Sequence, residues 1–165
     1  NGYKHIGFVT ITSAQTQMRD RLNGYNQAVS EFSLTPYIKK IPFELQHEKI
    51  VDEIRQFLED HPTMDAMLFA TNYLAISGLE AIRMLQRSIP GDIAVIGFDD
   101  NTHFALFSPS ITAVAQPVQE ISDQVVKQLM ACLDSREKAQ EKKTTVIPTR
   151  LIVRDSSRPV LRQSQ

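Results

Sequence analysis

Apolar runs and amphipathic stretches alternate along most of the chain. Short apolar or alternating runs predict strands over residues 5–10, 37–43, 65–70, 92–98, 111–115, 144–147 and 150–153. Apolar positions at helical spacing predict helices over residues 15–32, 48–58, 72–86 and 117–133. This order indicates an α/β fold, a parallel sheet with helices on both faces.

The predicted strand over residues 92–98 ends on two carboxylates, within a segment that reads IPGDIAVIGFDD over residues 89–100. A short apolar run with β-branched residues suits a strand that is buried on both faces of the sheet. Ligands of open α/β sheets bind at the carboxyl ends of such strands. Asp99 and Asp100 therefore stand where we expect a ligand site.

The C-terminal part of the pattern is less regular. The helix over 117–133 has a wide apolar face and follows a sheet that already has its helices, which indicates that it belongs to another lobe. Cys132 lies among its apolar residues, so we expect a buried, unreactive thiol. The polar tail from Asp155 onward is expected to fray.

Composition and charge narrow the function classes. The chain has 165 residues, a size typical of one domain, with a net charge of −1 and a pI near 6.5. These values argue against a nucleic-acid-binding face. The basic residues Arg136, Lys138, Lys142 and Lys143 alternate with acidic ones and are interpreted as a solvated helix end and loop.

The sequence carries no sign of catalytic chemistry. The single cysteine excludes an internal disulfide, and the four histidines lack metal-ligand spacing, so we expect no metal. Gly91 and Gly97 lack dinucleotide-binding spacing, and no nucleophile–base pair is visible, so we expect neither a cofactor nor an enzyme. No apolar run has the length of a membrane span and no signal peptide opens the chain. Because Asn1 is not an initiator methionine, we expect a fragment of a longer protein.

Six segments in order resemble the effector-binding domain of the lactose/galactose repressor family of bacterial transcription regulators. They are GYKHIGF (2–8), RLNGY (21–25), DAMLFATNYLAISGLEA (65–81), IPGDIAVIGFDD (89–100), TAVAQP (112–117) and RDS (154–156). The resemblance covers nearly the whole chain. One departure is Thr71-Asn72, where members of the family carry asparagine–aspartate.

The resemblance implies a type I periplasmic-binding-protein-like fold, mainly its second lobe. The second lobe would comprise residues 1–116 and 144–155, and the crossover helix 117–135 would belong to the first lobe. A helix-turn-helix domain, which would contact operator DNA, is expected outside this chain. The helix over residues 72–86 carries Leu74, Leu79, Ile82 and Leu85, which fit the core, and the resemblance implies that it also faces a homodimer partner.

The function implied is that of a cytoplasmic regulator. A small effector, commonly a sugar or its phosphate, would bind between two lobes and modulate operator binding by biasing the angle between them. The alternative is a periplasmic sugar-binding protein of a transport system, which would share the fold and the cleft. A small-molecule hydrolase is a third class, without support in the sequence.

Two charged residues are the first candidates for ligand binding. Asp99 could accept hydrogen bonds from sugar hydroxyls, or could be a turn residue at a strand end; position and resemblance favour binding. The resemblance places Arg21 facing the cleft rather than in solvent, whereas Arg19 is expected to be exposed. Asp100 is interpreted as structural, as a helix cap for the residues from Asn101 onward.

Three further residues are candidates with open alternatives. Asn72 would begin a helix at the mouth of the cleft, and binding and purely structural roles are equally supported. Gln116 lies at the crossover between lobes and could contact the ligand or only the hinge. Phe43 could stack on a sugar ring or fill the core, a place for which Leu45 competes.

Overall fold

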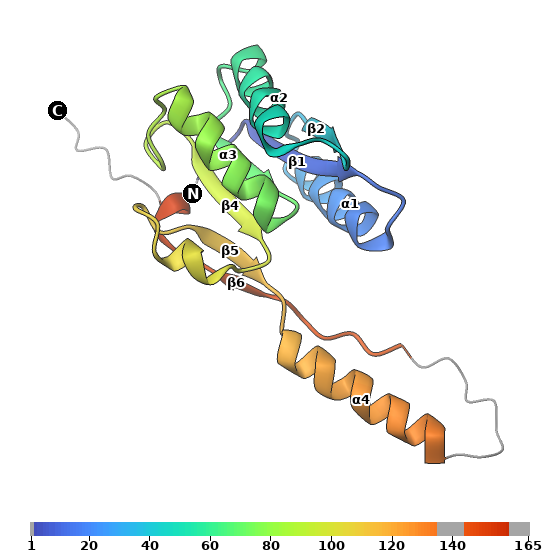
Figure 1. Ribbon diagram of the computed structural model, residues 1–165. Helices are drawn as coiled ribbons and strands as arrows, with labels where there is room; N and C mark the ends of the chain where they lie inside the picture. Colours follow the sequence, from blue (N-terminus) through green and yellow to red (C-terminus); the bar gives the residue numbers. More distant parts are fainter. Residues whose placement is uncertain (1, 135–143, 159–165) are drawn as a thin grey trace.

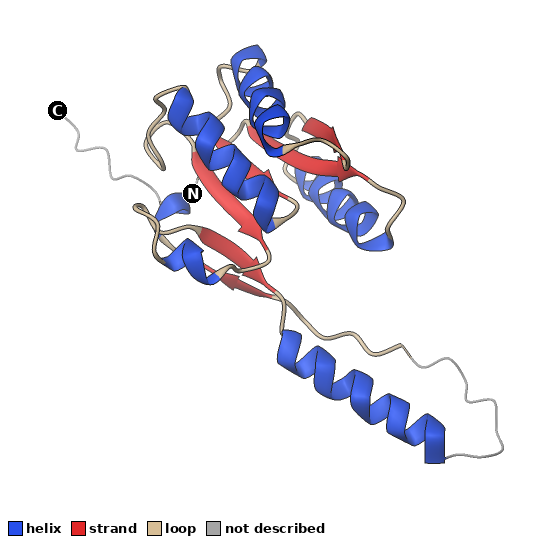
Figure 2. Ribbon diagram, viewed as in Figure 1, coloured by secondary structure: helices blue, strands red, loops and turns tan. Residues whose placement is uncertain are grey.

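The computed structural model describes residues 2–134 and 144–158 and contains one six-stranded sheet of order β2-β1-β3-β4-β5-β6 (Figures 1 and 2). The first five strands in this order pair in parallel, and β6 is antiparallel to β5. The strands are β1 (Ile6–Thr12), β2 (Tyr37–Pro42), β3 (Ala66–Phe69), β4 (Ala94–Phe98), β5 (Thr112–Ala115) and β6 (Arg150–Ile152). The helices are α1 (Thr16–Glu31), α2 (His47–Asp60), α3 (Asn72–Met84) and α4 (Val118–Asp134), with 3-10 turns η1 (Thr102–Ala105) and η2 (Asp155–Ser157).

Helices cover both faces of the sheet, which confirms the predicted α/β architecture. On one face, Phe8 of β1 stacks on Tyr25 of α1 with ring centroids 5.0 Å apart. On the other face, α2 and α3 pack together, and Phe69 of β3 lies against Gly78 of α3 (Figure 1). A Cβ atom at Gly78 would lie 2.0 Å from the Phe69 ring, so only glycine lets α3 approach the sheet this closely.

The return segment differs from the sequence prediction. Residues 144–149 form no strand, and only β6 pairs, over three residues of β5. A strand needs a neighbouring backbone, and an alternating sequence does not supply one. The predicted strand over residues 144–147 is therefore wrong. The predicted frayed tail is also wrong for Ser156 and Ser157, which are buried in η2.

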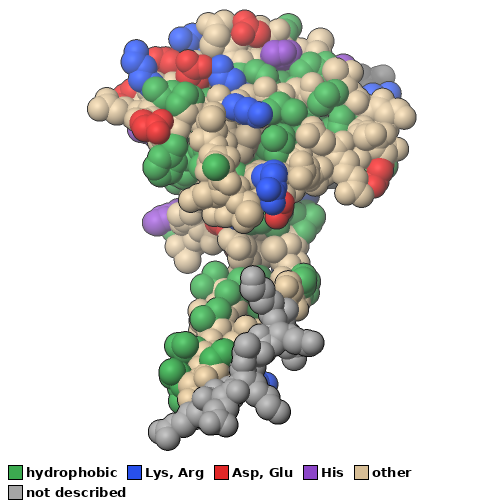
Figure 3. Space-filling view, turned by 90° about the vertical axis from the view of Figure 1, so that its right-hand side faces the viewer, with side chains coloured by type: hydrophobic (Ala, Val, Ile, Leu, Met, Phe, Trp, Pro, Cys, Tyr) green, Lys and Arg blue, Asp and Glu red, His purple; other side chains and the backbone are tan. Residues whose placement is uncertain are grey.

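Helix α4 projects away from the sheet (Figure 1). Figure 3 shows its apolar side chains on the surface of this arm; they are Val118, Ile121, Val125, Val126, Leu129, Met130 and Leu133. Cys132 is exposed, so the prediction of a buried thiol is wrong; the large apolar side chains of α4 are exposed as well. The predicted helix residue 135 and the basic residues Arg136, Lys138, Lys142 and Lys143 lie outside the described residues.

Candidate functional site

The carboxyl ends of the five parallel strands lie along one edge of the sheet. Phe43 follows β2, Asn72 comes three residues after β3, Asp99 follows β4, and Gln116 follows β5. Arg21 comes to this edge from the second turn of α1, because its guanidinium reaches the end of β3. The topology therefore places all five predicted site residues at one edge of the sheet.

Arg21 is held by three groups and is not a solvent-facing residue. Its Nη1 donates to the Ala70 carbonyl at 2.5 Å and lies 3.7 Å from Oδ2 of Asp99. Its guanidinium carbon lies 3.6 Å from the centroid of the Phe98 ring, a cation–π contact. The side chain is only 13% exposed. Burial lowers the pKa of Arg21 and the Asp99 carboxylate opposes this shift, but a guanidinium keeps its charge at neutral pH.

Asp99 joins Arg21 to Gln116. One carboxylate oxygen faces Arg21, and the other accepts a hydrogen bond from the side-chain amide of Gln116. The Asp99 amide donates to the Val114 carbonyl at 3.0 Å, which ties the residue to β5. About a third of the side chain is exposed. Since a carboxylate offers about four lone-pair sites, Asp99 can also accept hydrogen bonds from a ligand.

Asn72 and Phe43 lie at the same edge but stand apart from this cluster. Asn72 is the first residue of α3, and the helix is capped by Thr71, whose hydroxyl accepts from the Leu74 amide at 3.4 Å. Phe43 is 66% exposed, while Leu45 packs against the core. The core alternative for Phe43 is therefore wrong. Within residues 2–134 and 144–158, no hydrogen bond joins either residue to Arg21 or Asp99.

Asp100 has the structural role predicted for it, but not as a cap. Its two carboxylate oxygens accept from Nη1 and Nη2 of Arg154 at 2.8 and 2.9 Å, and this hydrogen-bonded pair raises the pKa of Arg154. The side chain of Asn101 caps η1 instead, because it accepts from the His103 amide at 2.9 Å. The contact of Arg154 with Asp100 could not be predicted from the sequence, because the two residues are 54 positions apart.

Beside Arg21, an apolar cavity of about 490 Å³ lies on the α1 face of the sheet. It is lined by Tyr25 and Phe32 of α1 and by the sheet residues Leu68, Phe98 and others. Strands β3 to β5 thus present apolar side chains next to the polar cluster.

The described residues contain neither a candidate metal site nor a candidate membrane span. In the part of the chain that the structure describes, no group of three His, Cys, Asp or Glu side chains could hold a metal ion. None of the helices over residues 2–134 and 144–158 combines the length and hydrophobicity that crossing a membrane requires.

Comparison with known proteins shows the family of the chain and its similarity to proteins named as transcription regulators. Residues 1–157 match the family described as periplasmic binding protein-like domain. The ribose operon repressor of Halalkalibacterium halodurans is 26% identical over 157 residues, which are 95% of this chain and 46% of the repressor. A complex of the transcriptional regulator CelR with cellobiose has a TM-score of 0.84 at 24% identity, over 94% of this chain and 47% of that chain. The lac repressor dimer bound to operator and the anti-inducer ONPF has a TM-score of 0.81 at 20% identity, over 94% and 53% of the two chains.

These similarities confirm the resemblance inferred from the six sequence segments, and the solved structures confirm the fold. The chain spans about half the length of the curated relatives that it matches. The chain that carries the polar cluster therefore matches only a part of each of these longer relatives.

Proposed function

We propose that this chain, which belongs to the periplasmic binding protein-like domain family, is the effector-sensing part of a DNA-binding transcription regulator. The observation that carries the proposal is the cluster of Arg21, Asp99 and Gln116 at the carboxyl ends of β3, β4 and β5. The relatives named as repressors and regulators support this class of function.

The effector proposed is a sugar or a sugar derivative. The Asp99 carboxylate can accept from neighbouring hydroxyl groups, while Arg21 and Gln116 supply donors beside it. Phe43 offers an exposed ring at the same edge, suited to the apolar face of a sugar, and Asn72 offers an amide. The cellobiose complex of CelR supports a sugar as ligand.

A two-lobe arrangement would complete the site. We propose that residues 1–116 and 144–155 form the second lobe and that the helix over 117–135 belongs to the first lobe, which supplies the other wall. The exposed apolar face of α4 supports this division, because seven large apolar side chains otherwise face solvent. A ligand that binds the closed arrangement more tightly would shift the lobe angle.

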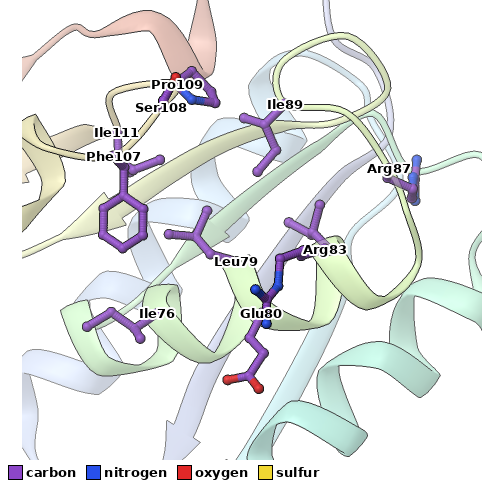
Figure 4. Close-up of a pocket in the computed structure, with 11 residues that line it drawn as sticks. Ile76, Leu79, Glu80, Arg83, Arg87, Ile89, Phe107, Ser108, Pro109 and Ile111 are labelled. Carbon is purple, nitrogen blue, oxygen red and sulfur yellow. The ribbon is translucent and has the colours of Figure 1, made fainter.

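A second copy of the chain is proposed to pack on the outer face of α3. A cavity of about 460 Å³ lies there. Figure 4 shows Ile76 and Leu79 of α3 on one side of it and Phe107 on the other. Leu106, next to Phe107, is 81% exposed. An apolar face that is open to solvent fits an isologous dimer contact.

Operator DNA would be contacted by a helix-turn-helix domain outside these 165 residues, which implies a cytoplasmic protein.

The alternative function is a periplasmic sugar-binding protein of a transport system, with the same fold. The names of the relatives favour the regulator over this alternative. A catalytic function has little support. Ser77 Oγ lies 3.2 Å from His47 Nδ1, and His47 Nε2 lies 2.9 Å from Glu80, but Ser77 is fully buried and its hydroxyl also contacts the Tyr73 carbonyl. A substrate could not reach that serine.

The test is a thermal-shift and calorimetric screen of the intact regulator with sugars, including cellobiose and ribose. A bound sugar at about 100 times its dissociation constant would stabilise the protein by roughly 2.7 kcal/mol. Asp99→Asn should remove most of this shift while the unliganded protein stays folded. Arg19→Gln, at an exposed residue of α1 close to Arg21 in sequence, should leave the shift unchanged. Normal binding by the Asp99 variant would contradict the assigned site.

A further inference from the structure

Asp99 adopts a backbone conformation that its surroundings must hold. Its φ angle is +67°, in the left-handed region. This region is disfavoured for most residues with a Cβ atom, and aspartate adopts it more readily than most, so neighbouring contacts contribute to holding it here. On one side, the Asp99 amide is fixed by its bond to the Val114 carbonyl. On the other side, the residue that follows must be fixed as well.

Asp100 is fixed by the guanidinium of Arg154. The two bonds of 2.8 and 2.9 Å form the two-pronged geometry that makes arginine–carboxylate pairs strong. Nη1 of Arg154 also donates to the Ile111 carbonyl at 2.7 Å. The side chains of Arg154 and Asp100 are only 17% and 20% exposed, so water screens the pair weakly.

The backbone of Arg154 is anchored independently of its side chain. Its amide donates to Thr112 Oγ1 at 2.8 Å, and its carbonyl accepts from the same hydroxyl at 3.0 Å. Two residues later, Ser156 Oγ donates to the Val95 carbonyl at 2.6 Å. Replacement of the guanidinium should therefore leave this segment attached to the sheet.

We propose that Arg154 is a positioning residue of the ligand site. Through Asp100, it holds Asp99 in the left-handed conformation that directs the Asp99 carboxylate toward Arg21 and Gln116. Arg154 itself contacts none of these three side chains among the hydrogen bonds of the described residues. The inference rests on the proposed function, because the ligand role of Asp99 is part of that proposal.

The first test needs no ligand and uses NMR spectra of the labelled 165-residue chain. The Cα and Cβ shifts and the amide–Hα coupling of Asp99 report its φ angle, and the side-chain amide of Gln116 reports the bond to Asp99. Arg154→Gln and Asp100→Asn should move both sets of signals. Arg154→Lys should shift these signals by an intermediate amount, because an ammonium group keeps the positive charge but cannot donate the two parallel hydrogen bonds of a guanidinium. The matched control is Arg150→Gln, at a 75% exposed arginine that pairs with Glu120, and it should move neither set.

The second test measures binding of cellobiose, or of the sugar that the screen identifies, to the intact regulator. Arg154→Gln should weaken binding about tenfold, which is the effect expected when one charged hydrogen-bonding group, Asp99, is no longer correctly oriented. In an Asp99→Asn background, Arg154→Gln should weaken binding little further, since the group that it positions has changed. Equal losses in both backgrounds would show that Arg154 acts by another route and would overturn the proposal.

Unchanged Asp99 and Gln116 signals in Arg154→Gln and Asp100→Asn would also overturn it. If Arg154→Gln does not fold, the same signals in Arg154→Lys and Asp100→Asn decide the question. If the wild-type regulator binds no sugar, the proposed function fails, whereas the ligand-free spectra still decide whether Arg154 positions Asp99.

Discussion

The hydroxyl of Ser156 bridges two strands in the interior, and its removal should destabilise the fold. Ser156 is fully buried. Its Oγ donates to the Val95 carbonyl of β4 at 2.6 Å and accepts from the Thr112 amide of β5 at 2.8 Å. Ser156→Ala would remove both bonds and leave a carbonyl and an amide buried at the same point.

The magnitude follows from the two groups left without this partner. Each buried polar group that loses its hydrogen bond costs about 1–3 kcal/mol, so Ser156→Ala should lower the free energy of unfolding by about 3 kcal/mol. In a domain of this size, that corresponds to a fall in Tm of roughly 6–12 °C. Urea unfolding followed by circular dichroism should show a lower midpoint with an unchanged slope.

Ser122→Ala is the matched control, because it deletes the same atom from an exposed position. Ser122 lies on α4, and its hydroxyl donates only to the Val118 carbonyl of its own helix. It should change the free energy of unfolding by no more than about 0.5 kcal/mol. A Ser156→Ala variant as stable as the Ser122→Ala variant would refute the argument that η2 fastens β4 to β5.

Three other predictions test the packing, the ionisation and the dimer face. Gly78→Ala should lower the free energy of unfolding by about 1–3 kcal/mol in a denaturation experiment, because the new Cβ would meet the Phe69 ring. Burial raises the pKa of the Tyr25 hydroxyl. The stability that the protonated hydroxyl contributes is therefore present below the ordinary pKa of about 10 and is lost as pH rises through the higher pKa of the folded state. In a series of melting curves at increasing pH, Tyr25→Phe should show a smaller decrease of Tm above about pH 10 than the wild type. In the intact regulator, Ile76→Glu should turn a dimer into a monomer in sedimentation velocity, whereas Lys49→Glu, at an exposed position of α2, should not. A dimer that persists in the Ile76 variant would contradict the proposed face.

The sequence predicted the part of the site that local pattern controls. An apolar strand that ends on an acid places Asp99 at the carboxyl edge, and Gln116 follows the next strand for the same reason. The sequence did not predict the contacts of Arg154, because the pairing with Asp100 joins residues 54 positions apart and forms only when η2 docks on β5. The predictions of a buried Cys132 and of a strand over residues 144–147 are wrong for a related reason, because burial and strand pairing depend on a neighbouring surface.

The sequence by itself determined the order of strands and helices and the edge at which a ligand would bind. Both follow from hydrophobic periodicity, which is local, and from the alternation of strands and helices along the chain, which predicts parallel strands. Only the tertiary structure decided which side chains the two adjacent acids contact. Asp99 turns toward Arg21 and Gln116, and Asp100 turns toward Arg154. Asp99 has a left-handed backbone, and the contacts of the two side chains come from elements distant in the sequence.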